Sequence, residues 1–246
     1  MTIQPLLLDV IRYMALGKIE NIAVSTTASG AMQLRTFDPD RDLIITGVSK
    51  QPQTFAGEFG LFNFKILKGL LAMKNFQTED AKVDVATRTL PDGSVSPDRI
   101  EFKAKGSRAT FRLMSREVVP DQPEIGKIPW DLVLDLTPSK IAEFAQMANL
   151  YAEVDPVFAL RSEAGALVAD FGNNSSSTHS GSMTLLDATP IQIAGDLQFR
   201  IDKFLLMLKT AAGAESSEVR LCSRGLLGVS ASTDQGTYDY MLKKSM

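Results

Sequence analysis

The chain has 246 residues, 44% of them hydrophobic, and a formal net charge of −3 at pH 7. This composition suits a globular protein with a sizeable core, and the net charge taken alone argues mildly against a nucleic-acid partner. Because no apolar run approaches the ~18 residues of a membrane span and Cys222 is the single cysteine, we expect no membrane helix and no intrachain disulfide. We also expect no secretory signal at the N-terminus.

Four helices are expected from apolar side chains spaced three and four residues apart. The first is opened by Pro5, which suits an initial helical turn, and is closed by Gly17. The third is opened by the capping residue Thr137, which Pro138 follows. In chain order the predicted helices cover residues 5–18, 62–75, 138–150 and 200–212.

Short β-patterned runs separated by turn residues predict strands between these helices. Tight connections between many short strands favour antiparallel sheets with helices laid on one face, an α+β fold. The predicted strands cover residues 21–25, 31–37, 43–48, 54–61, 81–87, 99–104 and 108–114 in the first half, and 132–136, 156–160, 166–171, 183–187, 191–198, 218–223, 226–230 and 237–242 in the second.

The two halves of the chain repeat each other at a spacing of about 136 residues. Residues 62–71 align with 199–208, which places Phe62 over Phe199, and residues 82–88 align with 218–224. This spacing is too long for a solenoid repeat and is typical of a duplicated small domain. We therefore predict an N-terminal domain over residues 1–115, an extended connector with three prolines over 116–130, and a C-terminal domain over 131–246.

Charge is distributed unevenly along the chain. The four predicted helices carry nine basic and three acidic residues, so the strands and loops are acidic. A basic surface on an acidic body is typical of a protein that meets a polyanion on one side. The alternative is that lysine and arginine occupy the solvated faces of these helices because they are good helix formers.

Together with the repeat, three short segments resemble the DNA sliding clamps, the rings that hold replicative polymerases on DNA. They are the helix 64–73 with the strand 55–61 before it, the segment 137–144 that opens the third helix, and the C-terminal segment 236–243. Lys243 stands where the eukaryotic pattern has a proline, and several connectors also differ from that pattern. A clamp of the tailed-phage type, related to proliferating cell nuclear antigen, fits these residues best.

The resemblance implies the DNA clamp fold, with two similar domains that each carry two helices on antiparallel sheets. Clamps with two domains per chain are trimers, so it also implies a homotrimer closed head-to-tail into a ring. The subunit interface would then join the last strand of the first half to a strand of the second. Its residues would be Thr110, Phe111, Arg112, Leu113, Met183 and Leu185.

Two further sets of site residues follow from the resemblance. Cations on the helices would face DNA phosphates without reading bases, and these are Arg12, Lys65, Lys68, Lys74, Lys140, Arg200, Lys203 and Lys209. A pocket beside the connector would receive apolar peptide motifs of partner proteins, although simple packing of the connector on the sheet is the alternative. The pocket residues would be Phe37, Leu43, Val118, Val119, Pro120, Ile125, Ile128, Tyr240 and Leu242.

We expect neither catalysis nor a metal or other cofactor. Asp38, Asp40 and Asp42 are spaced like the start of a calcium loop, but the glycine and the distal glutamate of such a loop are missing. His179 lies in a serine-rich loop without a partner cysteine or acidic cluster, and the sequence offers no nucleophile–base pair.

The expected function is a sliding clamp that encircles double-stranded DNA and tethers the replicative polymerase. Its expected partners are DNA, a DNA polymerase and a clamp-loader ATPase, with no membrane, in the cytoplasm of an infected bacterial cell. The competing hypothesis is a non-enzymatic, β-rich structural or interaction protein of a virion with a duplicated domain.

Overall fold

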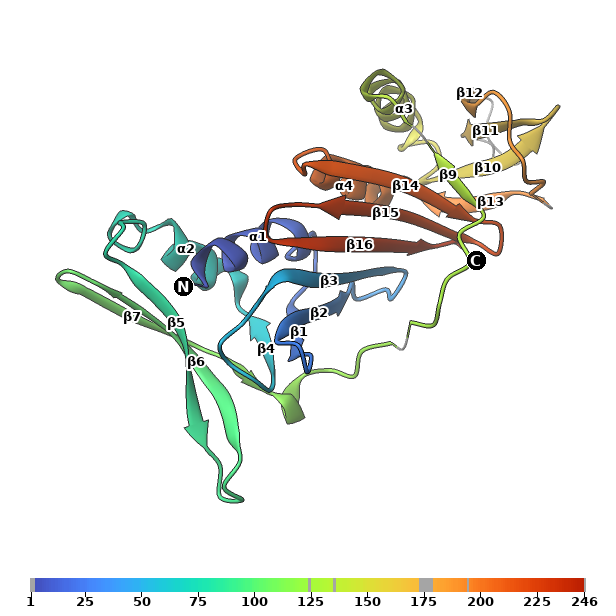
Figure 1. The fold of residues 1–246 in the computed structure, drawn as a ribbon. Helices are drawn as coiled ribbons and strands as arrows, with labels where there is room; N and C mark the ends of the chain where they lie inside the picture. Colours follow the sequence, from blue (N-terminus) through green and yellow to red (C-terminus); the bar gives the residue numbers. More distant parts are fainter. Residues whose placement is uncertain (1–2, 124, 135, 173–178, 194, 246) are drawn as a thin grey trace. The chain divides into compact units, whose positions relative to one another are not determined.

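A computed structural model of the protein describes residues 3–123, 125–134, 136–172, 179–193 and 195–245 (Figure 1). Asp135 and Ala194, which fall inside two of the predicted strands, lie outside the described residues. None of the helices in the described ranges is long and apolar enough to cross a membrane.

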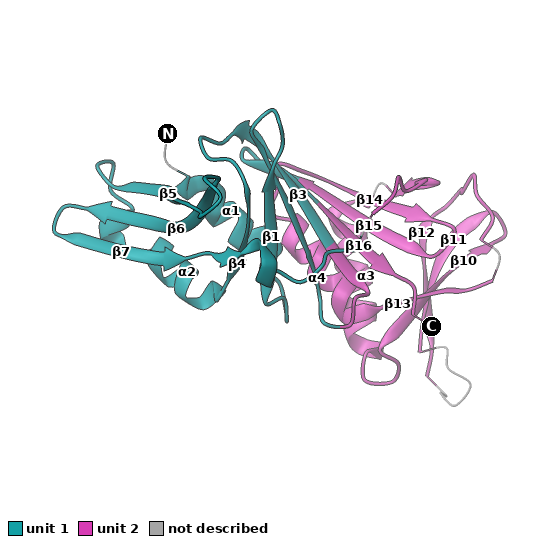
Figure 2. Cartoon of the chain, turned by 90° about the horizontal axis from the view of Figure 1, so that it is seen from below, with its two compact units in different colours: residues 1–39, 45–123, 232–238 teal, residues 40–44, 124–231, 239–246 magenta. Residues whose placement is uncertain are grey.

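The chain divides into two compact units (Figure 2). Unit 1 consists of Met1–Pro39, Ile45–Pro123 and Ser232–Tyr238, and unit 2 consists of Asp40–Ile44, Glu124–Ala231 and Asp239–Met246. The long crossing from unit 1 to unit 2, after Pro123, falls inside the predicted connector 116–130. Two short segments, 40–44 and 232–238, belong to the opposite unit from their chain neighbours, and in this respect the units differ from the two contiguous domains expected.

Unit 1 contains two α-helices and two runs of antiparallel strands. The strands run in the orders β8-β4-β1-β2-β3 and β5-β6-β7. The elements are α1 (Gln4–Met14), β1 (Asn21–Thr26), β2 (Ala31–Phe37), β3 (Leu43–Pro52), β4 (Glu58–Phe62), α2 (Phe64–Ala72), the 3-10 helix η1 (Lys74–Phe76), β5 (Lys82–Thr89), β6 (Val95–Ala104), β7 (Ser107–Arg112), β8 (Met114–Ser115) and the 3-10 helix η2 (Arg116–Val118).

Unit 2 is built in the same way. Its strands run in the orders β12-β11-β10-β13 and β16-β15-β14-β9. The elements are β9 (Leu132–Leu134), α3 (Pro138–Tyr151), β10 (Val157–Glu163), β11 (Ala166–Phe171), β12 (Gly181–Leu186), β13 (Leu197–Arg200), α4 (Ile201–Ala211), β14 (Ser216–Cys222), β15 (Leu226–Ser232) and β16 (Gly236–Lys243). The first three residues of β16 belong to unit 1.

The two halves share one topology. Apart from the short strands β8 and β9, each has a helix, four strands, a second helix and three further strands. The four strands pair in corresponding orders, β4-β1-β2-β3 and β13-β10-β11-β12. The aligned residues 62–71 and 199–208 form the passages from β4 into α2 and from β13 into α4. The internal repeat predicted from the sequence is therefore a repeat of structure.

In unit 1 an aromatic pair holds α1 against the segment 232–238. The rings of Tyr13 and Tyr238 stack with their centroids 5.0 Å apart, and the Tyr238 hydroxyl donates to the Asp9 carboxylate over 2.8 Å. The Thr233 hydroxyl donates to the same carboxylate. Burial raises the pKa of Tyr13, while the nearby Arg12 guanidinium opposes that rise. Packing and hydrogen bonding thus fix this short segment in unit 1.

In unit 2 a cluster of phenylalanines joins both helices to the sheet. Phe144 of α3 is fully buried, and its ring lies 5.0 Å from Phe158, 5.2 Å from Phe171 and 5.2 Å from Phe204 of α4, measured between ring centroids. Aromatic pairs at these separations add to the stability gained from area burial. Phe144 is therefore the centre of the unit 2 core.

Replacing Phe144 by alanine should lower the free energy of unfolding by about 3–5 kcal/mol, because the change leaves a cavity among three other rings. Urea unfolding followed by circular dichroism measures this loss. Leu150→Ala on the same helix is the matched control: Leu150 is exposed, so its truncation should change stability by less than about 0.5 kcal/mol. Equal losses in the two variants would contradict this description of the core.

Candidate functional site

The cations of unit 1 point into solvent from its helices. On α2 the buried Leu67 and Leu71 face the core, which leaves Lys65 and Lys68 on the outside. Lys65, Lys68 and Lys74 are exposed, and their ammonium groups have no hydrogen-bond or ion-pair partner among the described residues. Arg12 of α1 is also exposed, and its guanidinium lies 5.4 Å from the centre of the Tyr13 ring. These four cations are free to meet an anion.

Most of the predicted DNA-facing cations of unit 2 already have hydrogen-bond partners within the chain. Arg200 donates through Nε and Nη2 to the two carboxylate oxygens of Asp202, each over 3.0 Å. The hydrogen bonds to Asp202 raise the pKa of Arg200. Partial burial, the largest single effect on Asp202, would raise the pKa of that carboxyl, but the hydrogen bond and charge of Arg200, together with the backbone amide and charge of Lys203, lower it overall. Lys140 Nζ donates to the Leu185 carbonyl oxygen over 2.9 Å. Lys209 is exposed and has no side-chain partner in the described part of the chain.

Lys203 is a correction to the predicted DNA-facing set. Its side chain is only 10% exposed, and Nζ pairs with Asp40 over 3.0 Å and with Asp42. An ammonium group in such a pair is not available to a phosphate. Asp40 and Asp42, two carboxylates of the calcium-like spacing, accept hydrogen bonds from this lysine. Sequence periodicity placed Lys203 on a basic helix but could not show that these carboxylates meet it.

The predicted interface strands lie at sheet edges. β7 is an outer strand of β5-β6-β7, and β12 is an outer strand of β12-β11-β10-β13. Thr110 is exposed on β7, and Arg112 is exposed but donates to the Asp98 carboxylate over 2.9 Å. Leu113 is half-buried and its amide donates to the Asp98 carbonyl oxygen over 3.0 Å.

The predicted interface set needs correction at its apolar members. Phe111, Met183 and Leu185 are buried, because alternate residues of each strand face their own unit's core. Their side chains therefore cannot line a contact with another chain. The groups of β7 and β12 that can contact another chain are therefore their backbone amides and carbonyls and their outward side chains.

The predicted peptide pocket is also corrected in part. Leu43, Val119, Tyr240 and Leu242 are buried, so they are core residues and not the lining of an open pocket. The remaining members are accessible to different degrees. Val118 is 66% exposed, Pro120 is exposed, and Phe37, Ile125 and Ile128 are half-buried.

The two ends of the connector each pack against a glycine, and neither contact was predicted from the sequence. Val119 packs on Gly60, where an added Cβ would lie 2.7 Å from Val119 Cγ2. Trp130 packs on Gly228, where an added Cβ would lie 2.5 Å from the ring, and the Arg220 guanidinium covers that ring at 4.8 Å. The lone tryptophan at the end of a proline-containing connector was the signal that could have indicated an anchor.

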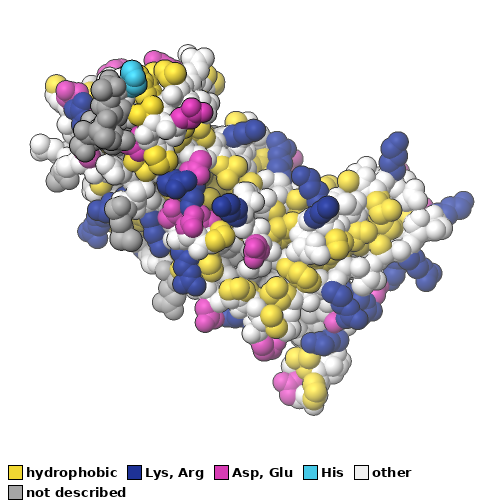
Figure 3. Space-filling view, turned by 180° about the vertical axis from the view of Figure 1, so that it is seen from behind, with side chains coloured by type: hydrophobic (Ala, Val, Ile, Leu, Met, Phe, Trp, Pro, Cys, Tyr) yellow, Lys and Arg dark blue, Asp and Glu magenta, His cyan; other side chains and the backbone are white. Residues whose placement is uncertain are grey.

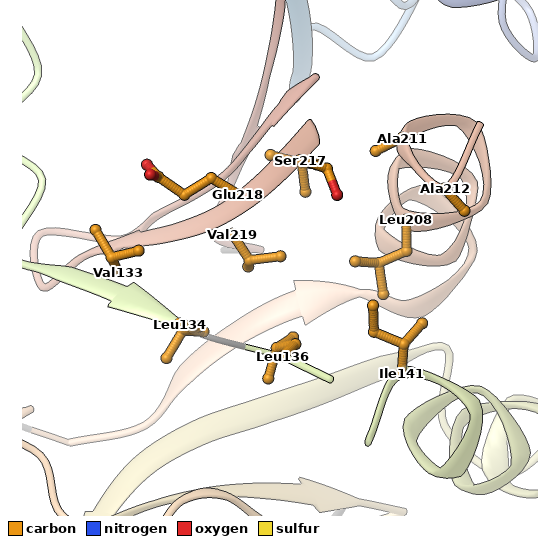
Figure 4. Close-up of a pocket in the computed structure, with 11 residues that line it drawn as sticks. Val133, Leu134, Leu136, Ile141, Leu208, Ala211, Ala212, Ser217, Glu218 and Val219 are labelled. Carbon is orange, nitrogen blue, oxygen red and sulfur yellow. The ribbon is translucent and has the colours of Figure 1, made fainter. Parts of the chain in front are cut away.

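A cavity of moderate size is found among the described residues of each unit. In unit 2 a cavity of about 260 Å³ opens between β9, α3, α4 and β14, and Figure 4 shows apolar side chains turned toward it, with Ser217 and Glu218 as the polar members. In unit 1 a cavity of about 300 Å³ lies beside Ile3, Phe55 and Val85, with Asp84 and Asp234 also in its lining.

Comparison with known proteins identifies the fold. No protein-family model and no curated protein matches the chain. A solved structure of the "C-terminal region of FEN-1 bound to A. fulgidus PCNA" matches it with a TM-score of 0.67 and 12% sequence identity, over 100% of this chain and 97% of that chain. At this identity the match shows the fold alone. The chain has the α+β DNA clamp fold with two similar domains, as the sequence predicted.

The ion pair of Lys203 can be tested against an exposed lysine of the same helix. Lys203→Met retains the apolar stem and removes the charge, and it should lower the free energy of unfolding by about 1.5–3 kcal/mol, the range for hydrogen bonds to charged groups. Lys209→Met, at an exposed position, should change it by less than about 0.5 kcal/mol. Urea denaturation measures both, and a Lys203→Met variant as stable as Lys209→Met would show that the ion pair is not structural.

Proposed function

We propose that the protein is a sliding clamp, three copies of which close into a ring around duplex DNA. The observation that carries this proposal is the match to a clamp over the whole chain. A chain that matched only half of a clamp could serve a different function in a different assembly. Here the match includes the helices and sheets of both units. The ring would keep a polymerase on DNA by topology, without strong contacts to any one sequence.

Ring closure is supported by the free edges of β7 and β12. Leu113 donates its amide to Asp98 of β6, and amides of an antiparallel strand point alternately to either side. The amides of Arg108, Thr110 and Arg112 therefore point away from β6, toward the free edge. A strand edge of this kind pairs readily with another chain. Pairing β7 of one copy with β12 of the next is heterologous, and such contacts close a ring when the rotation fits.

Binding to DNA is supported by the exposed cations of the helices. Contacts to phosphates carry no sequence information, so a ring that uses only such contacts can move along any duplex. The chain would act without catalysis, metal or cofactor. The alternative hypothesis of a virion structural protein has no observation in its favour beyond the duplicated β-rich units.

Partner proteins would reach the ring through short peptides. In the matched structure the C-terminal region of FEN-1 is bound to PCNA. For this chain we propose that the half-buried Ile125 and Ile128 of the connector contact the tail of a DNA polymerase and a clamp-loader ATPase. A tailed-phage origin and action in the cytoplasm of the infected bacterium complete the proposal.

The β7 edge provides the test of assembly. Thr110→Pro removes one outward amide without removing a bond to β6, and proline is tolerated on edge strands. Native mass spectrometry should give a trimer for the parent and a monomer for Thr110→Pro, while circular dichroism stays unchanged. Thr110→Val keeps the amide and should remain a trimer. A trimeric Thr110→Pro variant would rule out pairing at this edge, and a monomeric parent would contradict the ring.

A further inference from the structure

We infer that unit 1 holds the duplex through α2, and that the matching helix surface of unit 2 does not hold it. This inference rests on the proposed function and adds to it which half of the chain contacts the phosphates. The surface concerned is the outward row of α2, defined as Lys65, Lys68 and Gly69.

The outward row carries two unpaired charges on one side of the helix. Residues three apart on a helix are neighbours, so the Lys65 and Lys68 side chains leave α2 close together. Both are exposed, and neither ammonium has a partner among the described residues. Two adjacent free cations on a rigid element are suited to successive contacts with a phosphate backbone.

The internal repeat supplies a comparison within the same molecule. Aligning Phe62 with Phe199 places Asp202, Leu205 and Leu206 at the positions of Lys65, Lys68 and Gly69. Two positive charges in unit 1 are thus replaced by one negative charge and an apolar side chain in unit 2. Asp202 also binds Arg200, so it engages the cation just before α4 as well.

The other helix cations deepen this difference. In unit 2, Lys203 is held by Asp40 and Asp42, and Lys140 donates to a backbone carbonyl, which leaves Lys209 as the exposed cation of α4. In unit 1, Arg12 and Lys74 add exposed charge to that of the outward row. On the face shown in Figure 3, Lys and Arg side chains stand apart from Asp and Glu over much of unit 1, whereas the two kinds lie close together over unit 2.

Gly69 is a second, independent observation on the same row. Glycine is among the least favourable residues in a helix interior, and a Cβ added at Gly69 would meet nothing within 4 Å. Packing within the chain therefore gives no reason for glycine at this position. Without a side chain, the helix surface beside the two lysines stays flat, which lets an external backbone come close.

The test compares two double variants that each remove two lysines from helices. Lys65→Ala with Lys68→Ala alters the outward row, and Lys140→Ala with Lys209→Ala is the matched control in unit 2. Binding of a short fluorescent duplex is measured over a salt series. The first variant should reduce the slope of log affinity against log salt by about 0.9 for each cation that contacts a phosphate, and so by about 2 in all. The control should reduce it by less than half as much.

Equal reductions in both double variants, or a larger one in the control, would overturn this inference and leave the proposed function standing. A parent chain that binds no duplex at any salt concentration would overturn both. Gly69→Ala adds a separate measurement: it should raise the thermal midpoint by about 2–4 °C through helix propensity and weaken duplex binding. A stabilised Gly69→Ala variant with unchanged binding would contradict the close approach at Gly69.

Discussion

Every strand must pair or shield its backbone amides, and this requirement governs both units of the protein. Within each half the four-strand group satisfies it by the same pairing order, and the helices cover one face of the sheets. β7 and β12 are among the outer strands of these sheets, so on one side of each no strand lies beside it in the described part of the chain. A second copy of the chain can supply that strand, and a head-to-tail contact of this kind needs two different edges in one chain. Duplication of one folding unit provides both.

Much of this fold could be predicted from the sequence because apolar periodicity records which face of an element is buried. The spacing of Phe64, Leu67 and Leu71 predicted α2, and the matching spacing of Ile201, Phe204 and Leu208 predicted α4. These helices belong to the repeated units, and the clamp topology was predicted from the resemblance of three short segments to sliding clamps. The edge positions of the strands near Thr110 and Met183 were predicted as well. Local patterns were sufficient wherever the structural cause was local.

Features that depend on long-range contacts could not be read in this way. Lys203 lies on a basic helix in the sequence, but its ion pair with Asp40 and Asp42 joins residues far apart in the chain. Tyr240 and Leu242 alternate like residues of any strand, and alternation does not tell whether the opposite face is covered. Trp130 packs on Gly228 because glycine has no side chain, but a glycine in the sequence does not show which residue will pack on it. Several residues predicted for the candidate site are therefore buried or ion-paired within the chain, and they cannot contact a partner.

The proposed DNA surface on the helices is small, because only a few of their cations are both exposed and unpaired among the described residues. In the proposed clamp, weak contacts of this kind would not hold a polymerase on DNA for long, so retention would come from closure of the ring. Threading onto a linear duplex tests this directly, with the two DNA ends blocked by bulky protein either before or after the clamp is added. A ring should resist a high-salt wash only when the ends were open during mixing and blocked afterwards. Retention that does not depend on when the ends are blocked would contradict topological binding.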